Sequence, residues 1–142
     1  MNNRFKFRIC HESNGHKTII YPPTNTFMIG LDGKVYENYK KRNDHGAIDN
    51  LWEEVFDADN VIIQQFTGLT DKNGKEVYEG DIVKVCRSYG YGWLSKGSVA
   101  EVSFDEKELC YFLRGKFRLT SKKVVEVIGS IYENPELLKE VI

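Results

Sequence analysis

The segment from Phe66 to Val85, FTGLTDKNGKEVYEGDIVKV, constrains the fold of this chain more than any other part of the sequence. Asn73-Gly74 is a hairpin-turn signal, because both residues tolerate the positive φ angles of tight turns. Gly80-Asp81 leads into an apolar strand pattern over Ile82–Arg87. A glycine there permits a sharp corner, and the aspartate can accept hydrogen bonds from nearby backbone N–H groups. The segment therefore predicts a hairpin followed by a corner and a strand.

Short strand patterns separated by turn signals continue along the whole chain. The expected strands are Arg4–Cys10, Thr18–Tyr21, Thr26–Leu31, Lys34–Tyr39, Val61–Phe66, Ser98–Phe104, Leu109–Arg114 (continuing towards Leu119) and Val124–Tyr132. Asp32-Gly33 predicts a two-residue hairpin, and Gly129 predicts a bulge or bend. This spacing is typical of small barrels. We expect a mainly β (β-rich α+β) protein with a small Src-homology-like twisted barrel in its C-terminal part.

The chain is expected to divide into two parts. Residues 1–60 form a β-rich N-terminal region, with Asn38–Asn50 as an exposed polar loop and Asp49–Phe56 as a short helix or irregular segment. Residues 61–142 form the small barrel domain. Asn134 at the N-cap and Pro135 at the first helical position predict a short closing helix. Its apolar stripe would be Leu137, Leu138, Val141 and Ile142.

The composition favours a folded protein without a bias towards anionic partners. Hydrophobic residues make up 41% of the 142 residues, and the formal net charge is −1. The three cysteines, Cys10, Cys86 and Cys110, suggest no disulfide framework, so we expect a reducing cytoplasm. The N-terminus lacks a signal-peptide pattern, and no apolar run is long enough for a membrane span.

Five segments form a distinctive set: Phe66–Leu69, Asp71–Glu76, Tyr78–Val83, the ending Val127–Leu137 and the opening Phe5–Ile9. Together they resemble the YopX family of phage and prophage proteins. One departure is visible, since such proteins usually have Trp-Asp after the opening strand, where this chain has Cys10-His11. The resemblance implies a β-rich, barrel-containing protein encoded by a phage or prophage. It brings no catalytic residues, so the signature residues are read as fold determinants.

The first candidate binding surface is an aromatic and basic stripe. If Arg87–Trp93 is extended, Arg87, Tyr89, Tyr91 and Trp93 share one face, with Lys96 nearby. Rings that stack on bases and cations that meet phosphates would suit single-stranded nucleic acid. The alternative is that the rings cover the barrel end or pack on another subunit.

The second candidate is the basic segment RGKFRLTSKK. Arg114, Lys116 and Arg118 would line one strand face, followed by Lys122 and Lys123, and could contact phosphates. The strand face of Arg4, Lys6 and Arg8 could extend this patch. The alternative is a solvated face that guards an edge strand against mispairing.

Other chemistry receives little support from the sequence. Cys10, His11 and His16 offer only three ligands across an expected turn, so no metal site is expected. The strand cysteines Cys86 and Cys110 have no nearby histidine. Most of the acidic residues that could act in catalysis or bind metal stand beside lysines in turns. They are Asp71, Glu76, Glu79, Asp81, Asp105, Glu106 and Glu108. We expect neither catalytic residues nor a cofactor.

These observations favour a non-enzymatic phage accessory protein of the cytoplasm that binds another protein or itself as a homo-oligomer. The contact surfaces would be Tyr89–Trp93 and the apolar helix Leu137–Ile142. The alternative is a nucleic-acid-binding accessory protein that uses the basic strand face and the Tyr/Trp loop. No membrane partner is expected.

Overall fold

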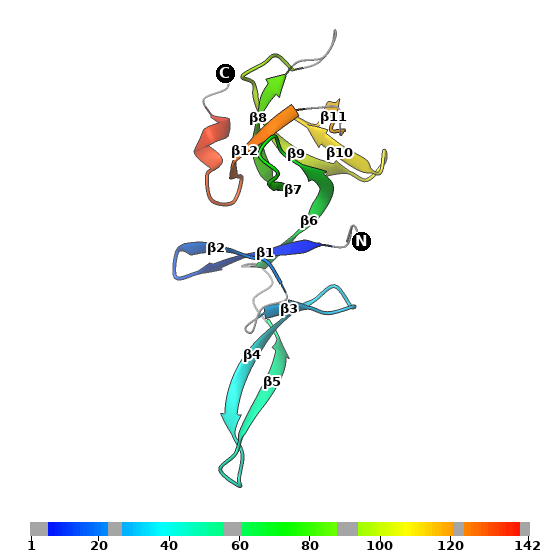
Figure 1. The fold of residues 1–142 in the computed structure, drawn as a ribbon. Coiled ribbons are helices and arrows are strands. Elements are labelled where there is room, and N and C mark those ends of the chain that lie inside the picture. The colour runs from blue at the N-terminus through cyan, green and yellow to red at the C-terminus, as the bar shows by residue number, and fades with distance from the viewer. Residues whose placement is uncertain (1–5, 23–26, 56–60, 88–93, 121–123, 140–142) are drawn as a thin grey trace. The chain divides into compact units, whose positions relative to one another are not determined.

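The computed structural model describes residues 6–22, 27–55, 61–87, 94–120 and 124–139. These residues form twelve strands and one 3₁₀-helix (Figure 1). The strands are β1 (Phe7–Ser13), β2 (His16–Ile20), β3 (Phe27–Ile29), β4 (Val35–Arg42), β5 (Ile48–Glu54), β6 (Val61–Thr70), β7 (Glu76–Tyr78), β8 (Asp81–Arg87), β9 (Val99–Asp105), β10 (Cys110–Leu113), β11 (Phe117–Arg118) and β12 (Val124–Ser130). The 3₁₀-helix is Pro135–Leu138. The expectation of a mainly β fold is confirmed.

The chain forms two compact units, one of Phe7–Ile63 and one of Met1–Lys6 with Gln64–Ile142. The sheet orders are β2-β1-β6-β7, β3-β4-β5 and β11-β10-β9-β8-β12. Strand β6 belongs to both units, because the chain passes from one to the other at Ile63. The expected domain boundary between residues 60 and 61 stays a prediction.

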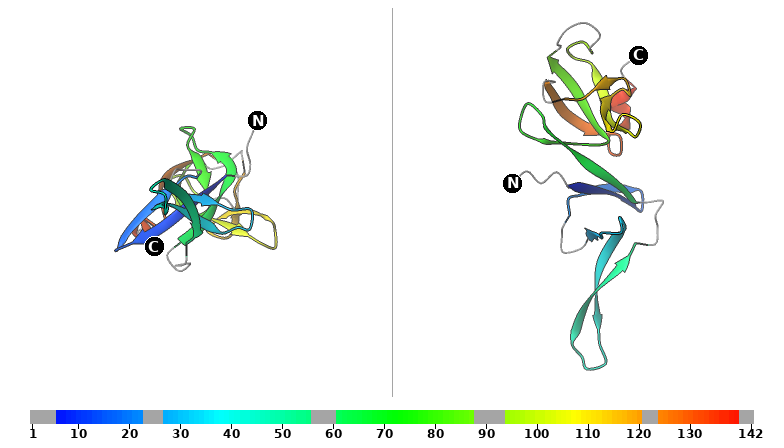
Figure 2. Two further views of the ribbon diagram at one scale, coloured as in Figure 1. Left: turned by 90° about the horizontal axis from the view of Figure 1, so that it is seen from below. Right: turned by 90° about the vertical axis from the view of Figure 1, so that its right-hand side faces the viewer.

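The second of these units is built around the five-stranded antiparallel sheet, which curls into a half-barrel (Figures 1 and 2). Alternate residues of β8 and β9 point into its core, where Val83, Val85, Ala100 and Val102 are almost completely buried. Strand β12 pairs with β8, and its register shifts between Val127 and Gly129. The bulge expected at Gly129 is therefore present.

The turn signals of the Phe66–Val85 segment act as predicted. Gly74 has a φ of +82° in the turn between β6 and β7, and Gly80 has a φ of +83° at the corner before β8. The amide side chain of Gln64 lies against Gly80, where a Cβ atom would come within 2.0 Å of its Nε2 atom. Only glycine fits this corner, because a side chain would meet both a clash and an unfavourable φ.

The unit of Phe7–Ile63 has a smaller core and a long β ribbon. Ile9, Phe27 and Val35 form the buried hydrophobic cluster of this core, and they tie β1, β3 and the first residue of β4 together. Strands β4 and β5 pair from Tyr36–Glu54 to Arg42–Ile48. Beyond Glu37, where the pairing of β4 with β3 ends, they continue as a two-stranded ribbon (Figures 1 and 2). The ribbon extends away from β1 and β2.

Two expectations for this region are wrong. Asn38–Asn50 is not a polar loop, and Asp49–Phe56 does not begin as a helix, because β4 runs to Arg42 and β5 begins at Ile48. The turn between them is built by Asn43, whose side-chain Oδ1 accepts hydrogen bonds from the backbone N–H groups of His45 and Ala47. A ribbon exposed on both faces has no alternation of apolar and polar residues, so its sequence looked like a loop.

Smaller corrections concern three local elements. The hairpin at Asp32-Gly33 is wider than two residues, since Gly30 and Lys34 close it by a backbone hydrogen bond of 2.8 Å. Arg8 was expected on an outer basic face but is only 2% exposed, because alternation gives a side chain's direction and not what covers that face. The closing helix is one 3₁₀ turn. Asn134 makes no side-chain cap to it, and Val141 and Ile142 lie outside the described residues.

Candidate binding surfaces

The aromatic part of the predicted stripe lies outside the described residues. This applies to Tyr89, Tyr91 and Trp93 of the stripe and to Lys122 and Lys123 of the basic segment. Arg87 ends β8 with an exposed side chain, and Lys96 is exposed in the turn before β9. The structure therefore positions Arg87 and Lys96 of the stripe and Arg114, Lys116 and Arg118 of the basic segment, and the extended stripe stays a prediction.

The basic segment after β10 does not form one strand face. Arg114, Gly115 and Lys116 make a turn between β10 and β11, with Arg114 at a φ of +52°. Only Phe117 and Arg118 continue as strand, so the expected alternation of three cations is wrong. The glycine next to Arg114 allows the reversal, which the charge pattern concealed.

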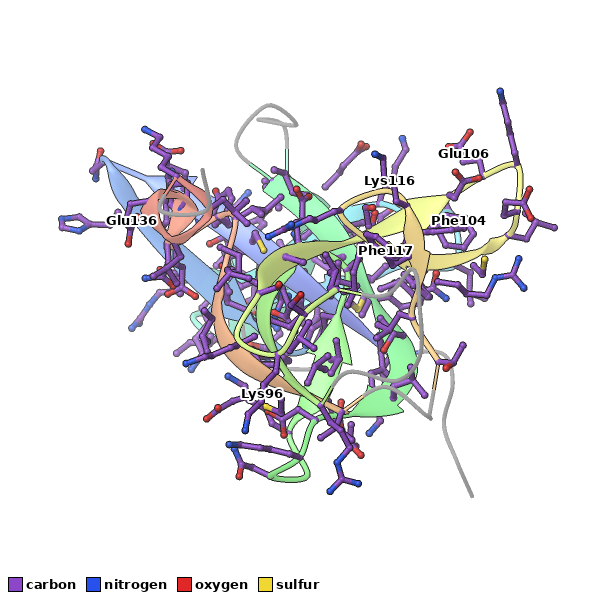
Figure 3. The ribbon with its side chains drawn as sticks, turned by 90° about the horizontal axis from the view of Figure 1, so that it is seen from above. Lys96, Phe104, Glu106, Lys116, Phe117 and Glu136 are labelled. Atoms are coloured by element: carbon purple, nitrogen blue, oxygen red, sulfur yellow. The ribbon has the colours of Figure 1, made fainter. Side chains whose placement is uncertain are left out.

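The basic side chains of this segment point to different places. Arg118 pairs with Glu108 at 3.3 Å between Nη2 and Oε2, so much of its charge is compensated. Figure 3 shows Lys116 beside Phe117, on the opposite side of that view from Lys96. Lys96 and Lys116 therefore do not belong to one patch.

Arg114 instead lies at a groove with Lys96. The guanidinium donates hydrogen bonds from Nε and Nη2 to the carbonyl oxygen of Val99, at 3.2 and 3.0 Å. The groove has a volume of about 420 Å³, and Ile128 and Leu137 supply its apolar wall. The bonds to Val99 hold the cation in place, which reduces the entropy lost when an anion binds.

A second groove of about 550 Å³ shares Lys96 and Gly97 with the first. Its other basic residues are Lys72 and Lys84. Glu126 pairs with Lys72 at 3.1 Å, and this hydrogen bond and the carboxylate charge raise the pKa of Lys72. Within the described residues, neither Lys84 nor Lys96 makes an ion pair. Lys72 and Lys84 were not among the predicted site residues, although Lys84 is an exposed charge in the middle of the Val-rich β8.

The β4–β5 ribbon is a further exposed surface, which the sequence did not predict. Ile48 is 60% exposed, Trp52 39% and Leu51 37%, and every residue of β5 is exposed. Large apolar side chains that gather on an exposed ribbon mark a contact surface. A turn signal was present, because Asn43 precedes Gly46, which has a φ of +81°.

The cysteine and histidine residues are not assembled into a site. Cys10 is buried in β1, whereas the ring of His11 lies 5.8 Å from that of Phe27. Cys86 and Cys110 are half-buried free thiols. Among the described residues, no group of three or more His, Cys, Asp or Glu side chains is placed to hold a metal ion.

Two carboxylates, Glu79 and Glu101, and the hydroxyl of Tyr111 interact electrostatically near the corner before β8. Burial raises the pKa of Glu101, and the charge of Glu79 raises it further. The same two causes, in the same order, raise the pKa of Tyr111. Neither of the two grooves described above is lined by Glu79, Glu101 or Tyr111, so we treat this group as a feature of stability.

Comparison with known proteins decides the family. The profile of the YopX protein family matches residues 26–139. The chain belongs to the YopX family. The crystal structure of protein EF1440 from Enterococcus faecalis is similar, with a TM-score of 0.58 at 26% identity, covering 94% of this chain and 96% of that one.

The crystal structure of YopX from Bacillus subtilis has a TM-score of 0.48 at 20% identity, covering 97% of this chain and 99% of that one. No curated protein matches the chain. The YopX resemblance of Phe66–Val83 and Val127–Leu137 is confirmed by the family match, whereas Phe5–Ile9 lies before the matched residues. These names state no activity, so function has to be argued from the surfaces. No helix within the described parts of the chain is long and apolar enough to cross a membrane.

Proposed function

We propose that this YopX-family protein is a non-enzymatic phage or prophage accessory protein that self-assembles or binds another protein in the host cytoplasm. The observation that carries the proposal is the β4–β5 ribbon with exposed Ile48, Leu51 and Trp52. An isolated two-stranded ribbon is only marginally stable in water. Exposed apolar residues on such an element stabilise it when a partner covers them.

Light scattering coupled to size-exclusion chromatography, over a range of protein concentrations, tests self-assembly. We expect a molar mass above the 16.4 kDa monomer that rises with concentration. Trp52→Ser should lower the mass towards the monomer, whereas Leu109→Ser should not, since Leu109 is 74% exposed in the turn between β9 and β10, which is not part of the ribbon. A monomer at every concentration would contradict self-assembly and leave binding to another protein.

Nucleic-acid binding is a second candidate, supported by the pair of grooves that share Lys96. Lys72, Lys84, Lys96 and Arg114 surround them, and among the described residues that line the two grooves Glu126 is the one acid. Cations at adjoining grooves can follow a phosphate backbone. The strand-face arrangement of Arg114, Lys116 and Arg118 no longer supports this function, but the grooves do.

Fluorescence anisotropy of a labelled single-stranded oligonucleotide across a salt series tests this candidate. We expect binding that weakens with salt, by a logarithmic slope of about 0.7 for each phosphate contact. A Lys84→Ala/Lys96→Ala variant should bind more weakly and with a smaller slope. Lys116→Ala is the matched control, because it removes an exposed cation away from Lys96 (Figure 3). No binding at low salt would exclude the candidate.

A further inference from the structure

The strand register assigns the ribbon side chains to two faces. Residues directly opposite in an antiparallel pair lie on the same face, and successive residues alternate between faces. One face, here called the Trp52 face, consists of four cross-strand pairs. They are Tyr36 with Glu54, Asn38 with Trp52, Lys40 with Asn50, and Arg42 with Ile48.

Charge is separated along the Trp52 face. The two cations, Lys40 and Arg42, lie in the half nearest the tip, and within the described residues neither makes an ion pair. The carboxylate Glu54 lies at the base, where Lys34 approaches it at 3.2 Å with both side chains exposed. Asp32 adds a second base carboxylate by accepting a hydrogen bond of 2.5 Å from the hydroxyl of Tyr36.

Apolar side chains occupy the space between and beside these charges. Trp52 and Ile48 are on this face, and they are 39% and 60% exposed. The aromatic ring of Tyr36 lies at the acidic end. The face therefore offers aromatic and aliphatic area together with one basic and one acidic end, which is the composition of a specific protein contact.

The opposite face of the ribbon does not have this arrangement. Glu37 lies directly across from Glu53, and Lys41 lies across from Asp49. An antiparallel copy of that face would set Asp49 near Glu53, which is unfavourable because like charges repel. The same copy would set Glu37 near Lys41, and Tyr39 and Leu51 lie between these charges, but the contact of Asp49 with Glu53 makes this face less self-complementary than the Trp52 face.

We propose that the Trp52 face packs against the same face of a second copy of this chain, with the two ribbons antiparallel about a two-fold axis. This inference rests on the proposed self-assembly and names its contact. A two-fold axis requires a surface that is complementary to itself, and a face with opposite charges at its two ends meets this condition.

The register then fixes which residues meet. A two-fold axis midway between the Asn38–Trp52 and Lys40–Asn50 pairs places Arg42 over Tyr36 of the second copy, next to that copy's Glu54. The guanidinium can lie on the tyrosine ring and pair with the carboxylate. Trp52 would be covered by Asn50 of the second copy and by the aliphatic part of its Lys40.

The size of the ribbon sets the expected affinity of the dimer. Seven paired residues at about 3.3 Å each give a face roughly 23 Å long, smaller than a standard interface of two stable partners. We therefore expect a reversible dimer whose population depends on protein concentration, with exchange of subunits when two variants are mixed.

Charge reversal with rescue tests the pairing, with sedimentation velocity of the full chain as the measurement. R42E and E54R should each weaken the dimer at least tenfold, because each places like charges together. An equimolar mixture of R42E and E54R should regain dimers, since each of the two contacts between positions 42 and 54 in the heterodimer again joins opposite charges. K41E is the matched control, because Lys41 lies at the same level on the opposite face and should leave the dimer unchanged. Circular dichroism establishes that each variant is folded.

The outcomes separate the inference from the proposed function. Dimers of unchanged strength in R42E and E54R would overturn the Trp52 face while leaving self-assembly in place. Weakened variants that fail to recover on mixing would overturn the antiparallel arrangement. A wild-type chain that is monomeric at all concentrations would overturn both the pairing and self-assembly.

Discussion

The carboxylate of Asp71 accepts a 3.0 Å hydrogen bond from the backbone N–H of Val127, which is 56 residues away in the sequence. Its other oxygen accepts bonds from the backbone N–H groups of Asn73 and Lys75, at 2.8 and 2.9 Å. Asp71 is only 7% exposed. One side chain thus shapes the β6–β7 turn and joins that turn to β12.

Asp71→Ala should destabilise the protein by about 3 kcal/mol, because it leaves three backbone N–H groups without their acceptor. Urea denaturation measures the loss. Asp105→Ala is the matched control, since Asp105 accepts hydrogen bonds only from Lys107 and Glu108 in its own exposed turn. We expect about 1 kcal/mol there. Equal losses in both variants would show that the bond to Val127 contributes nothing.

The lowered pKa of the Asp71 carboxylate predicts that the stability of the fold depends on pH. Burial opposes ionisation, but the N–H groups of Val127, Lys75 and Asn73 together lower the pKa of Asp71 below its ordinary 3.8. Because the pKa of Asp71 is lower in the folded than in the unfolded protein, ionised Asp71 stabilises the fold above the unfolded-state pKa. This stabilisation is lost as the pH falls through the folded-state pKa. Unfolding free energies of wild type and Asp71→Asn should therefore converge below about pH 4. A constant difference at every pH would refute the assignment.

Gly80→Ala should destabilise by about 3 kcal/mol, because its φ is +83° and a Cβ would lie 2.0 Å from Nε2 of the buried Gln64. The backbone cannot move away easily, since Gly80 bonds to Val102 and Ile131. Gly68→Ala tests the φ angle alone, with φ at +84° and open space around it. A loss of about 1 kcal/mol is expected for it. Similar melting temperatures of the two variants would argue against the clash.

Glu101→Gln should raise the melting temperature at pH 7. Burial, and then the charge of Glu79, raise the pKa of Glu101 above its ordinary 4.5. Because the pKa of Glu101 is higher in the folded than in the unfolded protein, its contribution to stability is fully present below the unfolded-state pKa. That contribution is lost as the pH rises through the folded-state pKa. The gain should therefore vanish near pH 4. Glu106→Gln, in the exposed turn after β9, serves as control. An equal gain at both pH values would contradict the prediction.

Local sequence signals predicted the turns and many strands of this chain. Asn73-Gly74, Gly80-Asp81 and the Asp105–Glu108 turn have the expected structure, because glycine, asparagine and aspartate act within a few residues of their own position. Regular alternation identified β8 and β9. The family followed from the same segments, since the signature residues build these corners.

The candidate surfaces were less predictable. Charge spacing suggested one face for Arg114, Lys116 and Arg118, but a turn at Gly115 directs them apart. The groove that joins Lys84 and Lys96 depends on the pairing of β8 with its neighbours, which no local pattern contains. The aromatic residues Tyr89, Tyr91 and Trp93 stay a prediction.

By itself, then, the sequence determined what short-range chemistry controls: the positions of the turns, the β character of the chain and its membership of the YopX family. The tertiary structure alone decided that Asp71 reaches Val127, that Arg8 is buried and that Lys40–Arg42 belongs to a ribbon rather than a loop. Those outcomes depend on which strands lie side by side and on what covers each face. Such long-range pairing is stabilised by the whole fold and cannot be recognised from a few neighbouring residues.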